Sequence, residues 1–214
     1  MALLGQPGLT GDSDRWIWTL DGSGAFSVQC VKAALKRQQH VPSPYTIKHN
    51  NWVPKKVEIL AWRAEMERLP TKCALERRNI NVGSILCPIC SEHNETAEHL
   101  LVSCGFAQAI WQAISLWLKI PPIFAFGLKD ILELHNFVGV SLKSKKAVYA
   151  VCLSVMWCVW KARNELIFNQ TGWSLEKVVG DIKALSFLWV KARSKHPGLD
   201  WKIWSGFNMY QLGW

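Results

Sequence analysis

Three cysteines and one histidine in this chain are spaced like the ligands of a zinc ion. Cys87 and Cys90 form a CxxC turn, eight residues separate Cys90 from His99, and four separate His99 from Cys104. Two cysteines with this spacing chelate one edge of a tetrahedron, and His99 and Cys104 lie about one helical turn apart. Four ligands leave no open coordination position, so the pattern predicts one structural Zn²⁺.

The same four residues have two alternative roles that involve no metal. They could be ordinary buried thiols with a core histidine, or a redox pair of the thioredoxin kind, which needs a βαβ setting that is not found here. His93 is the main rival for the nitrogen ligand, although it lies too near Cys90, inside the loop that has to wrap the ion. The remaining cysteines are scattered and are expected as small core residues: Cys30, Cys73, Cys152 and Cys158.

The composition favours a globular protein with a polyanionic partner. Half of the 214 residues are apolar and 13 are Trp, which excludes a disordered chain. The formal net charge of +9 favours binding of RNA or DNA through counterion release. The same charge could equally keep the surface soluble and serve no partner.

The cysteine content and the apolar segments indicate the compartment. Seven cysteines, three of them clustered, fit a metal site in a reducing environment better than a secreted disulfide framework. The first residues lack the pattern of a signal peptide, and the apolar stretch 147–160 is too short to span a bilayer. We therefore expect an intracellular protein, nuclear or cytoplasmic, with no membrane partner.

The elements that position the ligands are predicted to be mostly α-helical, with one small N-terminal β-hairpin. Residues 16–20 and 25–28, joined by a turn with two glycines, predict the hairpin. Apolar periodicity predicts helices over 31–38, after Pro54, after Thr71, around His99, and over 107–118, 128–137, 145–168 and 174–195. The Gly-rich, polar start predicts a flexible leader (1–14), and the break at Pro121-Pro122 divides a zinc-binding domain (15–120) from a C-terminal helical region (121–214).

No pattern in the sequence predicts catalysis. Asp21-Gly22-Ser23 resembles the start of an RNase H fold, but that chemistry needs several convergent acids and the six Asp residues follow no such pattern. No two Asp are adjacent, as a polymerase would need, and there is no P-loop, GxSxG or HExxH motif. We expect a protein that is not an enzyme and has no small-molecule substrate.

A series of short motifs resembles the zinc-binding domain of plant LINE-type (non-LTR) retroelement reverse transcriptases. The series covers residues 16–118 well, and residues 157–164 resemble a helix that commonly follows in the same polyproteins. The motifs are residues 24–28, 52–57, 61–63, 68–71, 75–78, 87–90, 95–96, 98–101 with Cys104, and 110–111. The resemblance implies a module C-terminal to the polymerase that binds element RNA or target DNA, and contact with a separate reverse transcriptase chain. It implies no activity here, because polymerase, endonuclease and RNase H motifs are not found.

Two functions follow from these patterns. The first is a nucleic-acid-binding zinc module whose contact residues are Lys55, Lys56, Arg63, Arg77 and Arg78. Trp52 and Trp62 lie among them and could stack on bases, but these charges could also be a solvated helix face, and Trp62 is expected in the core. The second is a structural or protein-interaction remnant of a retroelement without nucleic-acid binding. A clustered basic face would favour the first function, and an exposed aromatic patch the second.

Overall fold

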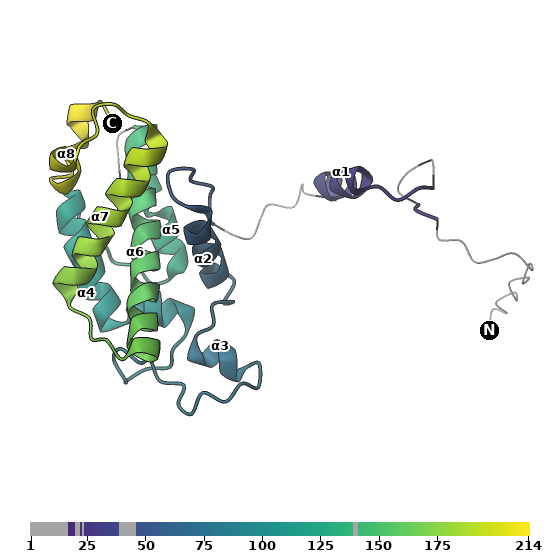
Figure 1. Ribbon diagram of the computed structural model, residues 1–214, viewed down its shortest axis with the longest axis horizontal. Coiled ribbons are helices and arrows are strands. Elements are labelled where there is room, and N and C mark those ends of the chain that lie inside the picture. The colour runs from purple at the N-terminus through teal and green to yellow at the C-terminus, as the bar shows by residue number, and fades with distance from the viewer. Residues whose placement is uncertain (1–16, 20–21, 23, 39–45, 139–140) are drawn as a thin grey trace, which may run out of the picture. The chain divides into compact units, whose positions relative to one another are not determined.

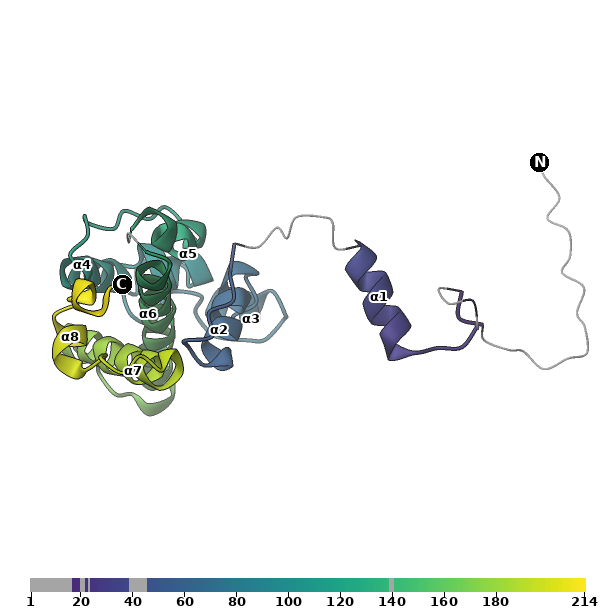
Figure 2. The ribbon, with the colours of Figure 1, turned by 90° about the horizontal axis from the view of Figure 1, so that it is seen from above.

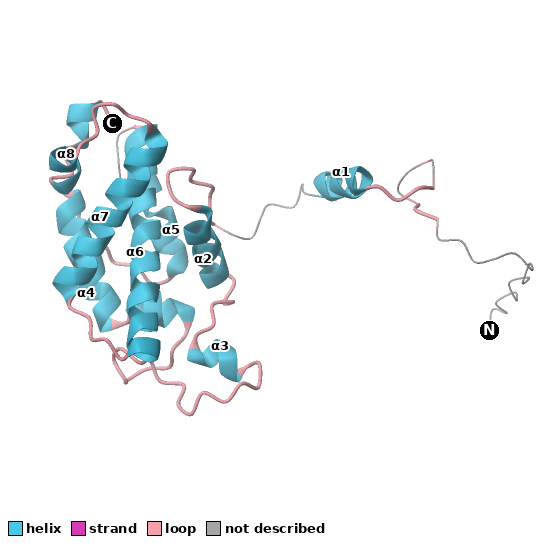
Figure 3. Cartoon of the chain, in the orientation of Figure 1, coloured by secondary structure: helices cyan, strands magenta, loops and turns pink. Residues whose placement is uncertain are grey.

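The structure is a computed structural model that describes residues 17–19, 22, 24–38, 46–138 and 141–214 (Figure 1). The chain divides into two compact units, Met1–Pro44 and Tyr45–Trp214. The mostly helical class is confirmed, since the described residues form helices and loops (Figure 3). The predicted leader, residues 1–14, lies outside the described residues.

The predicted N-terminal β-hairpin is wrong, because the described part of the chain contains no strand. The Trp18 N–H donates to the Gly24 carbonyl at 2.9 Å, and the Trp18 ring packs edge-on against Phe26. This turn then leads into α1 (Val28–Gln38). A two-stranded hairpin is marginal in water unless a third strand or a packed face supports it, so aromatic residues around a Gly-bearing turn are not sufficient.

The second unit is built around α6 (Leu142–Asn169), which contacts helices on several sides. Figure 2 shows α6 among its neighbours, which are α2 (Lys55–Glu65), α4 (Gly105–Leu118), α5 (Leu128–Phe137) and α7 (Leu175–Ser194). Its middle turns are apolar on every side, which is typical of a helix in the centre of a bundle. No helix in the described ranges is long and apolar enough to cross a membrane.

Several helices begin where local sequence signals predict. Pro54 precedes α2, where its missing N–H costs no hydrogen bond. The Thr71 side chain caps α3 (Lys72–Glu76) by accepting from the Ala74 N–H. Ser141 and Ser174 cap α6 and α7 in the same way. These starts place α2 and α3 one after the other on the chain that enters the cysteine loop.

One hydrophobic core runs through the second unit, and residues on both sides of Pro121-Pro122 contribute to it. The C-terminal tail, which the sequence leaves unassigned, closes this core through α8 (Trp201–Ser205) and the 3₁₀ turn η2 (Met209–Leu212). Trp204 is fully buried, and its indole N–H donates to the Lys183 carbonyl and the Ser186 hydroxyl. Leu199, Met209 and Trp214 are also buried, so these side chains of the tail serve packing.

Candidate metal centre and basic surface

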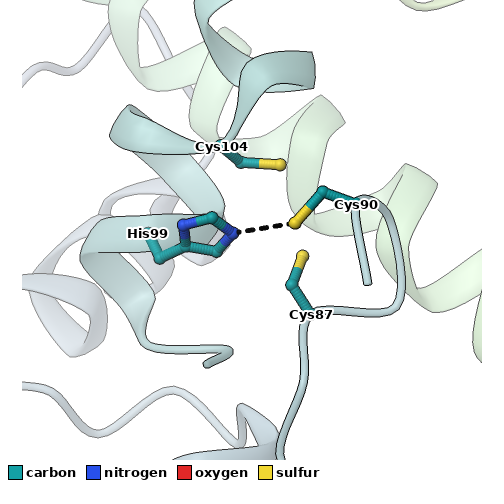
Figure 4. A group of neighbouring side chains, drawn as sticks. All are labelled: Cys87, Cys90, His99 and Cys104. Carbon is teal, nitrogen blue, oxygen red and sulfur yellow. Dashed lines mark hydrogen bonds between the residues drawn. The ribbon is translucent and has the colours of Figure 1, made fainter. Parts of the chain in front are cut away.

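The side chains of Cys87, Cys90, His99 and Cys104 converge at the edge of the core (Figure 4). Their three sulfurs and one nitrogen all lie within 4.8 Å of one another, and Cys90 Sγ is 3.4 Å from His99 Nε2. Zinc–ligand bonds of about 2.0–2.3 Å give tetrahedron edges of about 3.5–3.8 Å. Shifts of about 1 Å or less would therefore close the four atoms around one ion, so the donor set fits zinc in both type and size.

The two N-terminal cysteines lie on a tight turn in the metal loop, which we define as residues 85–98. Leu86 and Asn94 form an isolated antiparallel bridge, and the Cys87 N–H donates to the His93 carbonyl at 2.7 Å. Ser91 adopts a positive φ of 59°, which turns the chain back after Cys90. The local backbone thus folds the CxxC segment into a turn that places both sulfurs on the side facing His99.

The other two ligands come from η1 (His99–Ser103), a single π-helical turn, and the residue after it. The Cys104 N–H donates to the His99 carbonyl five residues earlier, at 2.7 Å. In an α-helix, residues five apart point about 140° away from each other. A π-helical turn contains more residues than an α-helical turn, so it brings the side chains of His99 and Cys104 closer to one direction. Such turns are frequent at functional sites. The Thr96 side chain supports the start of η1 by accepting from the His99 N–H.

Hydrogen bonds around the sulfurs favour the thiolate at Cys104 and the thiol at Cys87. The Cys87 thiol donates to Cys104, which raises the pKa of Cys87 and lowers the pKa of Cys104. The N–H groups of Phe106 and Ala107, in the first turn of α4, also lower the pKa of Cys104. Those of Ile89 and Cys90 act in the same direction on Cys87. Backbone donors are therefore aimed at the sulfurs that a cation would bind as thiolates.

The imidazole of His99 is prepared as a neutral ligand. Burial, and then the neighbouring His93, lowers the pKa of His99 below 6.5, so the ring keeps a free nitrogen near neutral pH. Its Nδ1 lies 3.4 Å from Ser103 Oγ, leaving Nε2 toward the sulfurs. His93 is exposed and belongs to a second, more exposed group with Cys90 and Glu92. The buried group of four contains His99 and not its rival.

A buried ion pair joins the metal loop to α6. Arg163 Nε lies 2.7 Å from Glu95 Oε1, and Arg163 Nη2 lies 2.8 Å from Glu95 Oε2. The second carboxylate oxygen also accepts from the Lys72 N–H at 2.7 Å. Glu95 is 0% exposed and Arg163 is 4% exposed. Sequence reasoning missed this pair, which spans 68 residues. No local signal in the sequence distinguishes Arg163 from the neighbouring charged residues Lys161 and Glu165 of the same helix.

Three of the five predicted nucleic-acid contacts lie on one exposed face of α2. Lys55, Lys56 and Arg63 are exposed there, together with Ile59 and Trp62 between them. Their spacing of four and then three or four residues makes a continuous stripe along the helix. Trp62 is 39% exposed, so its expected place in the core is wrong. Val57, Leu60, Ala61 and Ala64 fill the buried face and leave the indole at the boundary.

The two acidic residues within α2 contact the segment that precedes the helix, and Glu58 also pairs with Lys55 of the stripe at 2.9 Å. Glu65 accepts from the Thr46 and Ile47 N–H groups, and Glu58 accepts from the Asn50 N–H. Burial raises the pKa of Glu58, but hydrogen bonds from Lys55, Asn50 and His49 outweigh it and lower the pKa overall. Both carboxylates thus bind the segment that precedes α2, and Lys55 is paired with Glu58, whereas Lys56 and Arg63 form no ion pair within the described residues.

The other two predicted contacts, Arg77 and Arg78, lie in the turn just after α3. Arg77 Nη1 is 2.9 Å from Glu67 Oε2, and both side chains are exposed. Exposed pairs of this kind are weak, so a phosphate can replace the carboxylate. Arg78 is also exposed, and within the described residues no carboxylate lies close enough to pair with it. The two arginines line a shallow hollow with Glu65, Met66, Glu67 and Ala74.

The remaining predicted core cysteines divide into two groups. Cys152 and Cys158 are buried in α6, and burial raises the pKa of each to about 12. Cys30 and Cys73 are only half-buried. Neither group joins the converging ligands.

The ligand geometry agrees with the comparison against known families. Residues 26–111 match the family model for zinc-binding in reverse transcriptase. The matched segment contains all four converging ligands together with α2 and α3, and it ends within α4. No curated protein and no solved structure matches the chain. Sequence similarity and donor geometry therefore both support a zinc-binding module in this segment.

Proposed function

We propose that the chain is a non-catalytic zinc-binding module, derived from a plant LINE-type reverse transcriptase, that binds RNA or DNA. Cys87, Cys90, His99 and Cys104 would hold one Zn²⁺ in a closed, structural site. The ion would fix the metal loop beside α2 and α3, which carry the predicted contacts. This role suits an intracellular partner of nucleic acid and of a separate reverse transcriptase chain.

The observation that carries the nucleic-acid part is the separation of charges on α2. Lys56, Arg63 and Trp62 share the exposed face and form no ion pair within the described residues, while Glu65 binds backbone N–H groups and Glu58 binds the Asn50 N–H and Lys55. Lysine and arginine can neutralise phosphates, and an exposed indole can stack on an unpaired base. The metal loop contributes Glu92 and Glu98 to the surface and no Lys or Arg, so phosphate contact is assigned to α2 and α3.

Salt-dependent binding of single-stranded RNA and DNA, measured side by side, tests this proposal. Replacing Arg77 and Arg78 together by Ala should lower the log–log salt slope by about 1 to 2 while base preference is kept. Trp62→Ala should instead weaken binding about 5- to 100-fold with an unchanged slope, because stacking releases no counterions. A double substitution of Arg193 and Lys202 is the control, since both are exposed and lie on α7 and α8, outside the predicted contacts; α8 lies across α6 from α3 in Figure 2.

The outcome also decides between the two functions. An Arg77/Arg78 variant that stays folded, holds zinc and keeps the wild-type slope would exclude the proposed contact on α3. If the wild type shows no salt-dependent binding, a protein-interaction role becomes the better proposal.

One specific observation supports that second role. Phe124 and Phe126 are 84% and 91% exposed, and they border a cavity of about 630 Å³ between the α4–α5 connection and α4. Exposed aromatic side chains beside a hollow are typical of protein-binding surfaces.

A further inference from the structure

The metal loop has few apolar anchors of its own. Within residues 85–98 the buried side chains are Cys87, Glu95 and Ala97. Cys87 is one of the converging ligands and Ala97 is small, so neither supplies much apolar burial. Because the hydrophobic contribution of such a loop is small, its position has to depend on polar contacts and on the metal.

The strongest polar contact of the loop is the pair between Glu95 and Arg163. The carboxylate accepts two parallel bonds from the guanidinium and a third from the Lys72 N–H. Arg163 Nη2 also lies 3.4 Å from the Pro70 carbonyl, and Nη1 donates to Asn164 Oδ1 at 3.0 Å. The guanidinium further lies over the Trp160 ring. Nearly every donor is used, as a buried charge requires.

These bonds join three segments that are far apart in sequence. Pro70 and Lys72 belong to the start of α3, Glu95 belongs to the metal loop, and Arg163 belongs to α6. The Cys73 N–H adds a backbone bond to the Glu95 carbonyl at 3.4 Å. One guanidinium therefore fixes the metal loop and the helix before Arg77 and Arg78 at the same time.

We propose that Arg163 is a positioning residue for the metal centre, and that the metal-binding unit extends through α6, beyond the matched residues 26–111. The proposal rests on the proposed function for the identity of the ion. Arg163 binds no metal itself: it holds Glu95, which lies between Cys90 and His99 in the chain, and so sets the path of the loop that presents the ligands. Outer residues that orient ligands in this way affect metal affinity strongly.

The test uses full-length protein and two kinds of change at the pair. Arg163→Lys keeps the charge but cannot form two parallel bonds with the carboxylate. The double variant Glu95→Met with Arg163→Met removes both charges, so no buried charge is left unpaired. Val148→Ala is the matched control, because it makes a cavity in α6 about 22 Å from Arg163 along the helix. It lowers stability without touching the loop.

Two readouts separate positioning from general stability. Zinc affinity, measured by chelator competition well below the melting temperature, should fall about 10- to 100-fold in Arg163→Lys and in the double variant. Hydrogen exchange of the metal-free chain should speed up about tenfold or more at the Cys87 and Glu95 amides, with α7 unchanged. Val148→Ala should keep wild-type zinc affinity and wild-type protection of the loop.

Three results would overturn the proposal. The first is wild-type affinity and loop protection in both variants at the pair. The second is an equal loss of affinity in Val148→Ala, which would make the effect one of general stability. The third applies if the wild type binds no zinc, in which case the zinc part of the proposed function fails. The role of Arg163 is then tested separately, and unchanged hydrogen exchange of the metal loop in Arg163→Lys would refute it.

Discussion

Zinc binding should stabilise this fold. The linkage between binding and folding sets how much the free energy of unfolding increases. With free Zn²⁺ buffered at about 1,000 times its dissociation constant, the folded chain gains about 4 kcal/mol over the metal-free chain. For a chain of this size, each kcal/mol moves the melting temperature by about 2–4 °C. We therefore expect an increase of about 8–16 °C in the melting temperature on adding zinc.

The structure indicates which substitution should abolish this increase. Cys87 is fully buried, contributes one of the four converging donors and is held by backbone N–H groups. Cys87→Ser keeps the size of the side chain but loses the thiolate, so the variant should melt near the metal-free wild type at any zinc level. Cys152→Ala is the control, because Cys152 is equally buried but lies in α6, away from the ligands. It should cost about 1 kcal/mol and keep the whole zinc increase.

Circular dichroism melts in zinc buffers, with metal analysis of protein purified without chelators, measure both quantities. One zinc per chain and an increase that depends on Cys87 are the expected results. Protein that carries no zinc would refute the reasoning. So would a zinc increase that survives in Cys87→Ser or disappears in Cys152→Ala, because the wrong cysteines would then have been chosen.

Two further predictions concern the bundle. Burial, and the nearby Lys48 and Lys145, lower the pKa of His135 below its ordinary 6.5. The neutral ring therefore contributes its full stabilisation above pH 6.5, and this stabilisation is lost as the pH falls through the lower pKa of the folded chain. The melting temperature of metal-free His135→Phe should therefore fall less than that of the wild type between about pH 7 and about pH 5; an equal fall would exclude this histidine as the cause. Trp204→Ala should cost about 3–5 kcal/mol in denaturant unfolding, because a buried indole and its two hydrogen bonds are removed. Half-exposed Trp201→Ala is its control, and similar losses in the two would contradict the assignment of the tail to the core.

The sequence by itself determined the features that depend on near neighbours in the chain. The CxxC turn and the spacing of His99 and Cys104 indicated the donor set, because a few residues of backbone suffice to bring such ligands together. Helix starts at Pro54 and Thr71 follow from missing or capped N–H groups, which are local properties. Apolar periodicity located α5 and α7 to within a residue or two for the same reason.

Only the tertiary structure decided the features that depend on contacts between distant residues. The π-helical turn after Glu98 fits both His99 and Cys104 to one centre, and no sequence pattern distinguishes it from an α-helical turn. Tertiary packing leaves Trp62 partly exposed, and among the described residues the N-terminal aromatic side chains have no neighbouring strand of the kind a hairpin would need. The pairing of Glu95 with Arg163 depends on the fold that brings α6 to the metal loop. A buried charge is tolerated only when its partner is in place, and that partner is chosen by three-dimensional packing.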